Sequence, residues 1–218
     1  MKKLHLIGLF IFTLVIIVSC GKKTSVKEMH HPGTEILSEK YEYYTDENGK
    51  EIKNGFYEYY NESGKLSTKG KYKKNLRVGN WEKYHENGAV RSIAIFKNDS
   101  LNGPYEAFYQ DGTTKSTIMY KGGKRNGAYK SFYQNKQLQT AINYRDGKRE
   151  GIQKNYAEDG TLLFEKEYRN GVPHGLYKSF YKDGTIKETG YYKLAQPDSL
   201  WTTFNEAGKI MGTTQYNQ

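Results

Sequence analysis

The amino-acid sequence predicts an all-β protein: an elongated single-sheet meander of seven consecutive antiparallel β-hairpin repeats of 24 residues each. Three observations lead to this prediction. A glycine recurs every 24 residues from Gly55, aromatic residues follow it at fixed distances, and Gly- or Asn-containing turns separate short stretches of alternating polarity. A strict period indicates that one small structural unit is copied along the chain.

Each repeat is described by positions counted from its leading residue, so that Tyr57 is at position +2. The leading residues are Gly55, Gly79, Gly103, Gly127, Gly151, Gly175 and Ser199. Position +2 holds Tyr57, Trp81, Tyr105, Tyr129, Gln153, Tyr177 and Trp201. Positions +5 and +17 are aromatic in all seven repeats, and +9 is glycine except for Lys136. Rings that recur in every copy are expected to build the repeat.

The second half of a repeat has the pattern of a half-buried strand. In residues 138–144, apolar residues such as Leu138 and Ile142 alternate with polar residues such as Gln139 and Asn143. A period of two places the apolar set on one face of a strand. We therefore expect a strand in the second half of each repeat.

The first half of a repeat, such as residues 175–181, is aromatic and β-prone. Residues 182–184 (Lys-Asp-Gly) separate the two halves, and residues 146–148 (Asp-Gly-Lys) or 170–171 (Asn-Gly) separate consecutive repeats. Gly and Asn tolerate the positive φ of tight hairpin turns. Each repeat is thus predicted to be one hairpin. The aromatics at +2 and +5 have opposite parity, so they lie on opposite faces unless a bulge intervenes.

Both ends of the predicted repeat domain, residues 39–218, are atypical. Residues 41–44 followed by Asn48-Gly49 resemble a strand and turn but are out of register, which predicts a capping strand. The last repeat lacks its leading glycine and has Ala195 and Pro197 before it. Terminal repeats are expected to deviate in this way.

The N-terminus has the pattern of an export signal. Basic residues at 2–3 precede a short apolar run over residues 4–18, and residues 17–20 read Ile-Val-Ser-Cys. The run is shorter than the roughly 20 residues of a membrane-spanning helix, so residues 1–19 are predicted to be a signal peptide. The ending resembles a bacterial lipobox, which implies lipidation of Cys20, the sole cysteine of the chain. The alternatives are an uncleaved anchor or an ordinary signal peptide.

Residues 20–38 have no period and are predicted to be a flexible tether. A lipidated Cys20 would insert into a bilayer, so we expect an exported bacterial lipoprotein anchored at the periplasmic face or the cell surface. His30 and His31 lie in this segment without a fixed third ligand, and no metal site is predicted there.

The composition argues against a thick globular core. Mean hydropathy is −0.89 and tyrosine accounts for 21 residues, and tyrosine rings can bury area while keeping a hydroxyl in water. The net charge of +10 is compatible with phosphates, anionic lipids or acidic partners. Because Glu and Asp are mixed with Lys throughout, a solvated basic surface is the alternative.

The repeat pattern, best seen in residues 123–133 and 170–177, resembles the MORN repeat variant found in bacterial proteins. The resemblance extends from about residue 41 to residue 218. It implies a β-hairpin repeat used for protein or lipid contact, without catalytic residues of its own. Many bacterial members are labelled antitoxins of toxin–antitoxin systems, whereas a lipobox is not expected in a cytoplasmic antitoxin.

The sequence contains no motif that predicts catalysis. There is no Gly-x-Ser-x-Gly elbow, no His-Glu-x-x-His and no Walker-type phosphate loop. His85 and His174 occupy different repeat positions, and the sequence indicates no partner for either. We therefore predict no enzyme, no catalytic residue, no metal and no cofactor.

Two departures from the repeat are candidate binding residues. Position +3 changes from acidic to basic along the chain: Glu58, Glu82, Glu106, Lys130, Lys154 and Lys178. This column is either an ordinary solvated column or a polar strip for a partner of complementary charge. Position +6 holds the additional tyrosines Tyr109, Tyr133 and Tyr181. They either pack in the sheet or form an exposed aromatic ridge.

These observations predict a membrane-tethered, non-enzymatic binding or scaffold protein that contacts a protein partner in the cell envelope. Two alternatives remain, a module that binds glycan or cell wall and an antitoxin or immunity protein. Nucleic acid is not expected as a partner, because export would remove it from reach.

Overall fold

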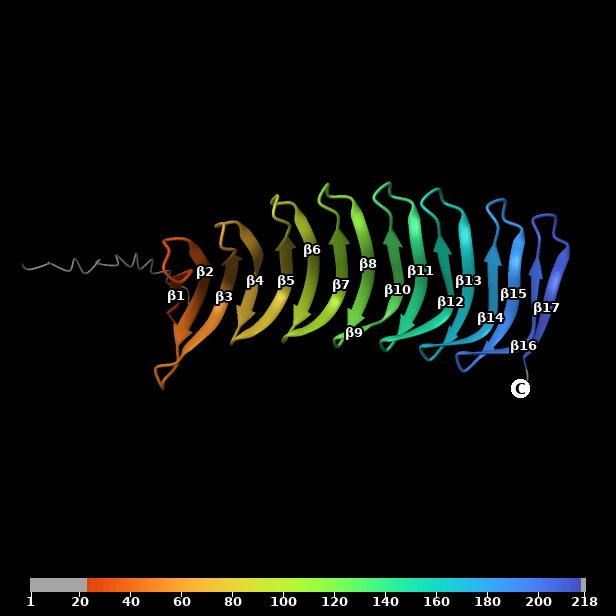
Figure 1. The fold of residues 1–218 in the computed structure, drawn as a ribbon. Coiled ribbons are helices and arrows are strands. Elements are labelled where there is room, and N and C mark those ends of the chain that lie inside the picture. Colours follow the sequence, from red (N-terminus) through yellow and green to blue (C-terminus); the bar gives the residue numbers. More distant parts are fainter. Residues whose placement is uncertain (1–22, 217–218) are drawn as a thin grey trace, which may run out of the picture.

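A computed structural model describes residues 23–216 of the chain. The predicted fold class is confirmed: the regular structure of these residues consists of strands joined into one open antiparallel sheet. Figure 1 shows the strands side by side in chain order along an elongated molecule. The predicted signal peptide, residues 1–19, and Cys20 lie outside the described residues.

The strands follow one another as a meander, each pairing with its neighbours in the chain. They are β1 (Ser25–His30), β2 (Leu37–Thr45), β3 (Glu51–Tyr60), β4 (Leu66–Lys73), β5 (Leu76–Tyr84), β6 (Val90–Lys97), β7 (Ser100–Phe108), β8 (Thr114–Lys121), β9 (Lys124–Arg125), β10 (Gly127–Phe132), β11 (Leu138–Arg145), β12 (Lys148–Tyr156), β13 (Leu162–Arg169), β14 (Val172–Phe180), β15 (Ile186–Lys193), β16 (Gln196–Phe204) and β17 (Ile210–Tyr216). The short β9 and β10 both pair with β8 and form one strand interrupted at Asn126.

The turns within hairpins have left-handed backbone where the sequence predicts it. Gly64 has a φ of 74°, and Lys136, which replaces glycine in the fourth repeat, has a φ of 70°. The turn that precedes the last repeat keeps the geometry of the other turns between hairpins, with Leu194 at 50° and Ala195 at 71° where Lys74 and Asn75 have 52° and 64°. The turn conformation is therefore imposed by the repeat even where glycine is absent.

The leading glycine of each repeat lies at an irregularity between consecutive hairpins. Lys69 pairs with Glu82, but Lys71 pairs with Val78, so the register shifts around Gly79. Gly79 has a φ of 65°, and Ser199 takes the same role with a φ of 59°. A positive φ is accessible to glycine at little steric cost, which accounts for the column.

A second bulge resolves the question of the two aromatic columns. Tyr59 pairs with Thr68 and Tyr60 with Leu66, so Ser67 of β4 is the extra residue. Because the bulge lies on the second strand, alternation along the first strand continues unbroken. Positions +2 and +5 therefore point to opposite faces. The face that carries +2, +15 and +17 is called the inner face, and the face that carries +3, +5 and +14 the outer face.

The core is a row of side chains on the inner face of this single layer. Seven hydrophobic side chains of the described residues are buried, all on the inner face: Tyr41, Trp81, Ala94, Ile118, Ile142, Tyr168 and Trp201. Neighbouring rings pack edge to face, with centroids 5.1 Å apart for Tyr72 and Trp81. The strands bend along their length (Figure 1). The inner rings are thus crowded together without a second layer above them.

Cations cover part of this aromatic row. The Arg77 guanidinium lies 4.1 Å from the centroid of Phe96, and the Lys53 ammonium lies 4.2 Å from that of Tyr41. Such contacts stabilise a positive charge over a ring face. Where Gln153 interrupts the aromatic column, Lys166 pairs opposite it and places its ammonium 4.9 Å from the centroid of Tyr192. The long side chain of Lys166 therefore extends over the rings of the following hairpin, Tyr177 and Tyr192.

The prediction of a flexible tether over residues 20–38 is wrong for β1. Ser25 pairs with Tyr43 as Gly55 pairs with Tyr72 in the next hairpin. Glu28 pairs with Lys40 in the same register. Strands β1 and β2 thus form a complete additional hairpin rather than a single capping strand. Its turns are longer than those of the later repeats, so the 24-residue period does not extend to it.

The two edges of the sheet differ in character. Strand β1 carries Lys27, whose ammonium pairs with Glu51 at 2.7 Å, and Glu28, which pairs with Lys40 at 2.9 Å. Strand β17 has no charged residue, and its side chains are exposed. Between residues 23 and 216, no helix has the length and apolar character needed to cross a bilayer.

Candidate binding surface

The column that changes from glutamate to lysine lies on the outer face, in a row of cross-strand pairs. Glu58 pairs across the ladder with Lys69, and Lys69 pairs with Glu82 on its other side. The Lys69 ammonium lies 3.2 Å from the Glu82 carboxylate. The hydrogen bond from Tyr84 and the contact with Lys69 hold the pKa of Glu82 below its ordinary value.

The far end of the row has the opposite charge order. Glu165 pairs with Lys154 on one side and with Lys178 on the other, and the Lys154–Glu165 ion pair spans 2.7 Å. Like charges in the column are therefore separated by an opposite charge at both ends. The interleaved counter-charges make the like charges of the column compatible.

In the middle of the row, counter-charges are missing. Glu106 and Lys130 both pair with Thr117, and neither makes an ion pair within residues 23–216. Glu58 and Lys178 also form no ion pair in this part of the chain, but each lies directly across the ladder from an opposite charge. Glu106 and Lys130 are therefore the two column members without a counter-charge on a neighbouring strand. A binding role for the six residues stays a prediction.

The three tyrosines at position +6 join consecutive hairpins. Their hydroxyls donate hydrogen bonds to the backbone carbonyl at position +5 of the next repeat, at 2.8 Å for Tyr109 to Phe132, 2.9 Å for Tyr133 to Tyr156 and 2.7 Å for Tyr181 to Phe204. All three side chains are half-buried. The structure thus gives them a role in packing, and ligand binding by them stays a prediction.

His85 takes the same position and makes the same contact. Its Nε2 lies 3.0 Å from the carbonyl oxygen of Phe108. His31 repeats this contact with the carbonyl of Tyr60, also at 3.0 Å. Because a carbonyl only accepts, Nε2 carries the proton in both rings. His85 therefore has a partner that the sequence did not indicate, and its role is structural.

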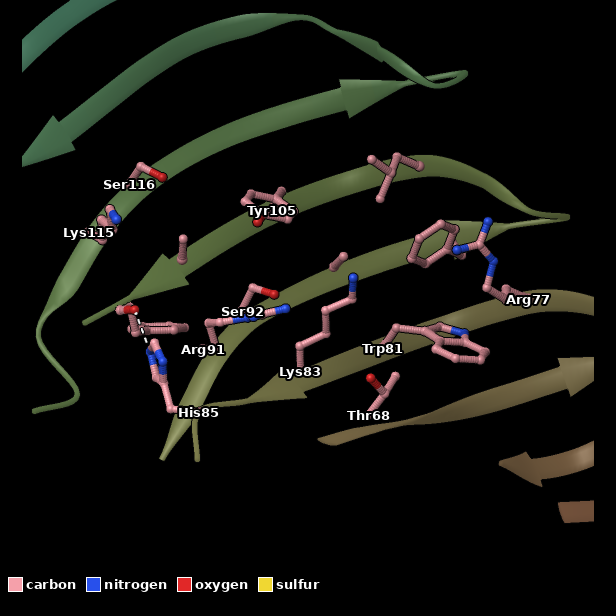
Figure 2. A pocket seen from close by; sticks show the side chains of 15 residues that line it. Thr68, Arg77, Trp81, Lys83, His85, Arg91, Ser92, Tyr105, Lys115 and Ser116 are labelled. Atoms are coloured by element: carbon pink, nitrogen blue, oxygen red, sulfur yellow. Dashed lines mark hydrogen bonds between the residues drawn. The ribbon is translucent and has the colours of Figure 1, made fainter. Parts of the chain in front are cut away.

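A hollow of about 540 Å³ opens on the inner face over β5 to β8. Lys83 of β5, Arg91 of β6 and Lys115 of β8 line it together with the rings of Trp81 and Tyr105. Figure 2 shows the Lys83 and Arg91 side chains extending over the sheet beside Ser92, with Lys115 and Ser116 at the far side. We call this site the basic hollow.

The formally charged residues that line the basic hollow are all basic. No Asp or Glu is among the lining residues. Of the four Lys and Arg residues that line it, Arg77 is neutralised by Asp99 at 2.9 Å, whereas Lys83, Arg91 and Lys115 form no ion pair within the described chain. Hydrogen bonds from Arg77 lower the pKa of Asp99, so that pair stays ionised. The other three cations are open to a negatively charged ligand.

The aromatic walls of the basic hollow are packed against other side chains. Trp81 is only 7% exposed and packs against Tyr57, Tyr72 and Phe96. Its indole N–H has no hydrogen-bond partner within residues 23–216, whereas the corresponding Trp201 donates to the carbonyl of Tyr191 at 3.1 Å. Trp81 therefore bounds the basic hollow without offering a free ring face.

Sequence reasoning missed these three cations, although a signal was present. At position +4, Lys83 is the one charged residue among the seven repeats. Position +12 is the bulged position, and it holds Arg91 and Lys115 in consecutive repeats. Which face the bulged residue joins depends on the backbone geometry. The sequence pattern alone did not give that geometry.

The comparisons with known proteins agree with the repeat. The family described as MORN repeat variant matches residues 77–98, 125–146, 149–170 and 173–194. Each match covers one hairpin and ends at the first residue of the turn that follows it, and the unmatched hairpins follow the same register. No curated protein matches the chain. The matched repeats define a class of repeat-based binding or scaffold modules that are generally not catalytic.

The described residues contain no group of three His, Cys, Asp or Glu side chains placed to hold a metal ion. The His30–His31 segment is part of this region, and His31 is engaged with the carbonyl of Tyr60.

Proposed function

We propose that the protein is a non-enzymatic, membrane-tethered binding or scaffold protein whose extended sheet holds a protein partner in the cell envelope. The observation that carries this proposal is the single-layer sheet, in which no other part of residues 23–216 covers either face. Such a sheet offers a long surface to a partner. Repeat proteins commonly use surfaces of this kind for binding.

The tether rests on the sequence of the first 20 residues. A basic start, the apolar run over residues 4–18 and Cys20 support export followed by lipidation. Two or more acyl chains would hold the protein at the membrane, since one chain gives only marginal binding. Strand β1 begins at Ser25, so only a few residues would separate the lipid from the sheet. The partner is then expected close to the membrane surface.

Crosslinking in intact cells tests both parts of the proposal. The full chain carrying a C-terminal affinity tag is crosslinked, purified and compared with its Cys20→Ser variant. We expect the unmodified chain in the membrane fraction with a reproducible crosslinked protein, and the variant released from the membrane with less of that protein attached. An unmodified chain in the soluble fraction would contradict the tether. No crosslinked protein at any position of the sheet would contradict the binding role.

Protein is a better-supported partner than glycan. Sugar-binding platforms need open ring faces for stacking, whereas the inner rings here pack against one another and under cations such as Arg77 and Lys53. Retention on purified peptidoglycan or polysaccharide would reverse this preference.

A further inference from the structure

We infer that the basic hollow binds an extended acidic segment of the partner protein, and that Lys83, Arg91 and Lys115 determine its specificity. This inference rests on the proposed function and names the chemistry that the partner must present. The three cations have no carboxylate of this chain to pair with inside the described residues. A ligand that brings negative charge to the basic hollow therefore meets complementary charge without breaking an existing ion pair.

The spacing of the cations favours a segment with several carboxylates over one small anion. Arg91 and Lys115 occupy the same position in consecutive repeats, so two strand spacings, about 10 Å, separate their backbones. A segment with several carboxylates can pair with each cation separately, whereas a single phosphate or carboxylate would require these long side chains to converge on one point. In an extended peptide, residues two to four apart lie about 7 to 13 Å apart. An acidic segment that crosses the strands along the length of the sheet matches this spacing.

The lining between the cations fits a peptide better than a nucleic acid. Ala94, Leu101 and Ala107 supply small apolar contacts beside the cations. Base recognition in single strands depends on stacking against open aromatic faces. Trp81 is nearly fully buried and Phe96 is covered by Arg77, so two of the rings cannot provide such faces. Carboxylates combined with aliphatic side chains therefore suit the basic hollow.

A peptide titration tests the inference directly. The full-length chain in detergent is titrated into a fluorescein-labelled eight-residue peptide in which Glu and Leu alternate, and fluorescence anisotropy is recorded. The matched peptide has Gln in place of Glu. We expect binding of the Glu peptide that weakens as salt increases and at least about tenfold weaker binding of the Gln peptide, because charge-pair recognition is screened by ions. Equal binding of both peptides would overturn the inference.

Variants assign the binding to the three cations. In Lys83→Gln/Arg91→Gln/Lys115→Gln we expect at least about a tenfold loss of affinity for the Glu peptide. The control Lys121→Gln/Lys193→Gln/Lys209→Gln removes the same charge from exposed lysines outside the basic hollow and is expected to bind as the unmodified chain does. The thermal unfolding midpoint of each variant reports folding, and the single variant Lys115→Gln, expected to bind several-fold more weakly, replaces the triple variant if that does not fold.

Further results distinguish an acidic segment from a phosphate ligand, and failure of this inference from failure of the proposed function. Tighter binding of a labelled oligothymidylate than of the Glu peptide, or displacement of the peptide by millimolar inorganic phosphate, would overturn the acidic segment in favour of a phosphate ligand. If the basic-hollow triple variant still crosslinks to the same partner in cells, the inference fails while the proposed function stands. If the unmodified chain crosslinks to no protein, the proposed function itself fails.

Discussion

The indole of Trp81 lies so close to Gly70 on the neighbouring strand that a Cβ at residue 70 would overlap its ring carbons. The second tryptophan of the chain repeats the relationship, with Trp201 over Gly190. Where position +15 holds a residue larger than glycine, position +2 of the next repeat holds a residue smaller than tryptophan. Ile118 is followed by Tyr129, and Ile142 is followed by Gln153. Side-chain sizes on the inner face therefore compensate between consecutive hairpins.

The Trp81–Gly70 contact predicts a destabilising substitution with a specific rescue. Gly70→Ala is expected to lower the free energy of unfolding by about 1 to 3 kcal/mol, because the added methyl group overpacks a buried ring. Chemical denaturation measures the change. In Gly70→Ala/Trp81→Tyr we expect recovery of much of the loss, since Ala94 followed by Tyr105 is a native combination. Gly212→Ala is the control, because the nearest atom to its added Cβ is at 3.5 Å. An equal loss in Gly212→Ala would contradict this account.

The hydroxyl contacts between hairpins predict a smaller effect. Tyr133→Phe removes the donor to the carbonyl of Tyr156 while keeping the ring. We expect a loss of about 0.5 to 1.5 kcal/mol in the free energy of unfolding, the usual net value of one hydrogen bond. Conversely, Ala157 occupies position +6 in the fifth repeat, and Ala157→Tyr is expected to stabilise the chain by adding the same contact. Unchanged thermal midpoints in both variants would argue against these contacts.

Acid is expected to weaken the hairpin turns. Hydrogen bonds from Thr113 and Gln134 lower the pKa of Asp111 to about 2. In the unfolded chain this carboxyl titrates near pH 3.9, so the stabilisation is present above that pH and is lost as pH falls through about 2. In Asp111→Asn, the side-chain acceptor remains without titration, as at Asn135 of the next repeat. Thermal unfolding between pH 5 and pH 2 is expected to depend less on pH in this variant than in the unmodified chain.

The outer charge row predicts a pair of compensating changes. Lys154→Glu brings a second carboxylate next to Glu165 and is expected to cost at most about 1 kcal/mol of unfolding free energy, because both groups are partly exposed. Lys154→Glu/Glu165→Lys restores opposite charges and is expected to recover the loss in a double-mutant cycle. Lack of recovery would show that the ion pair is not the cause.

Partner capture tests whether the position +3 column on the outer face binds the partner. Reversal of the three lysines in Lys130→Glu/Lys154→Glu/Lys178→Glu is expected to weaken capture of the crosslinked partner in a salt-sensitive way if the column binds. Capture equal to that of the unmodified chain would remove the outer row as a binding strip. It would leave the basic hollow as the remaining charged candidate.

The fold could be predicted from the sequence because every element repeats its signal. The leading glycines, the alternation and the turn residues all specify the same hairpin, and the structure places them as expected. The first hairpin escaped prediction because Lys27 stands where the other repeats have an aromatic or Gln153, and because its turns are longer. The local composition of β1 therefore resembles that of a linker, although its pairing with β2 is regular.

The candidate site was less accessible to sequence reasoning. Period and parity place Lys130 and Lys154 on one column, but the residues that interleave with them come from the neighbouring strand. Lys83 and Arg91 meet over the basic hollow only because a bulge shifts the second strand. Such contacts depend on where the bulge falls, which the repeat pattern does not encode.

Each hairpin makes its extensive contacts with its immediate neighbours along the chain. Pulling the two ends of the sheet apart would therefore load one hairpin interface at a time rather than the whole sheet at once. A released 24-residue repeat could extend to roughly 80 Å, compared with about 10 Å for two strand widths in the sheet. The molecule would respond to tension by lengthening stepwise, so that a bound partner could be displaced from its anchor while most of the sheet remains folded.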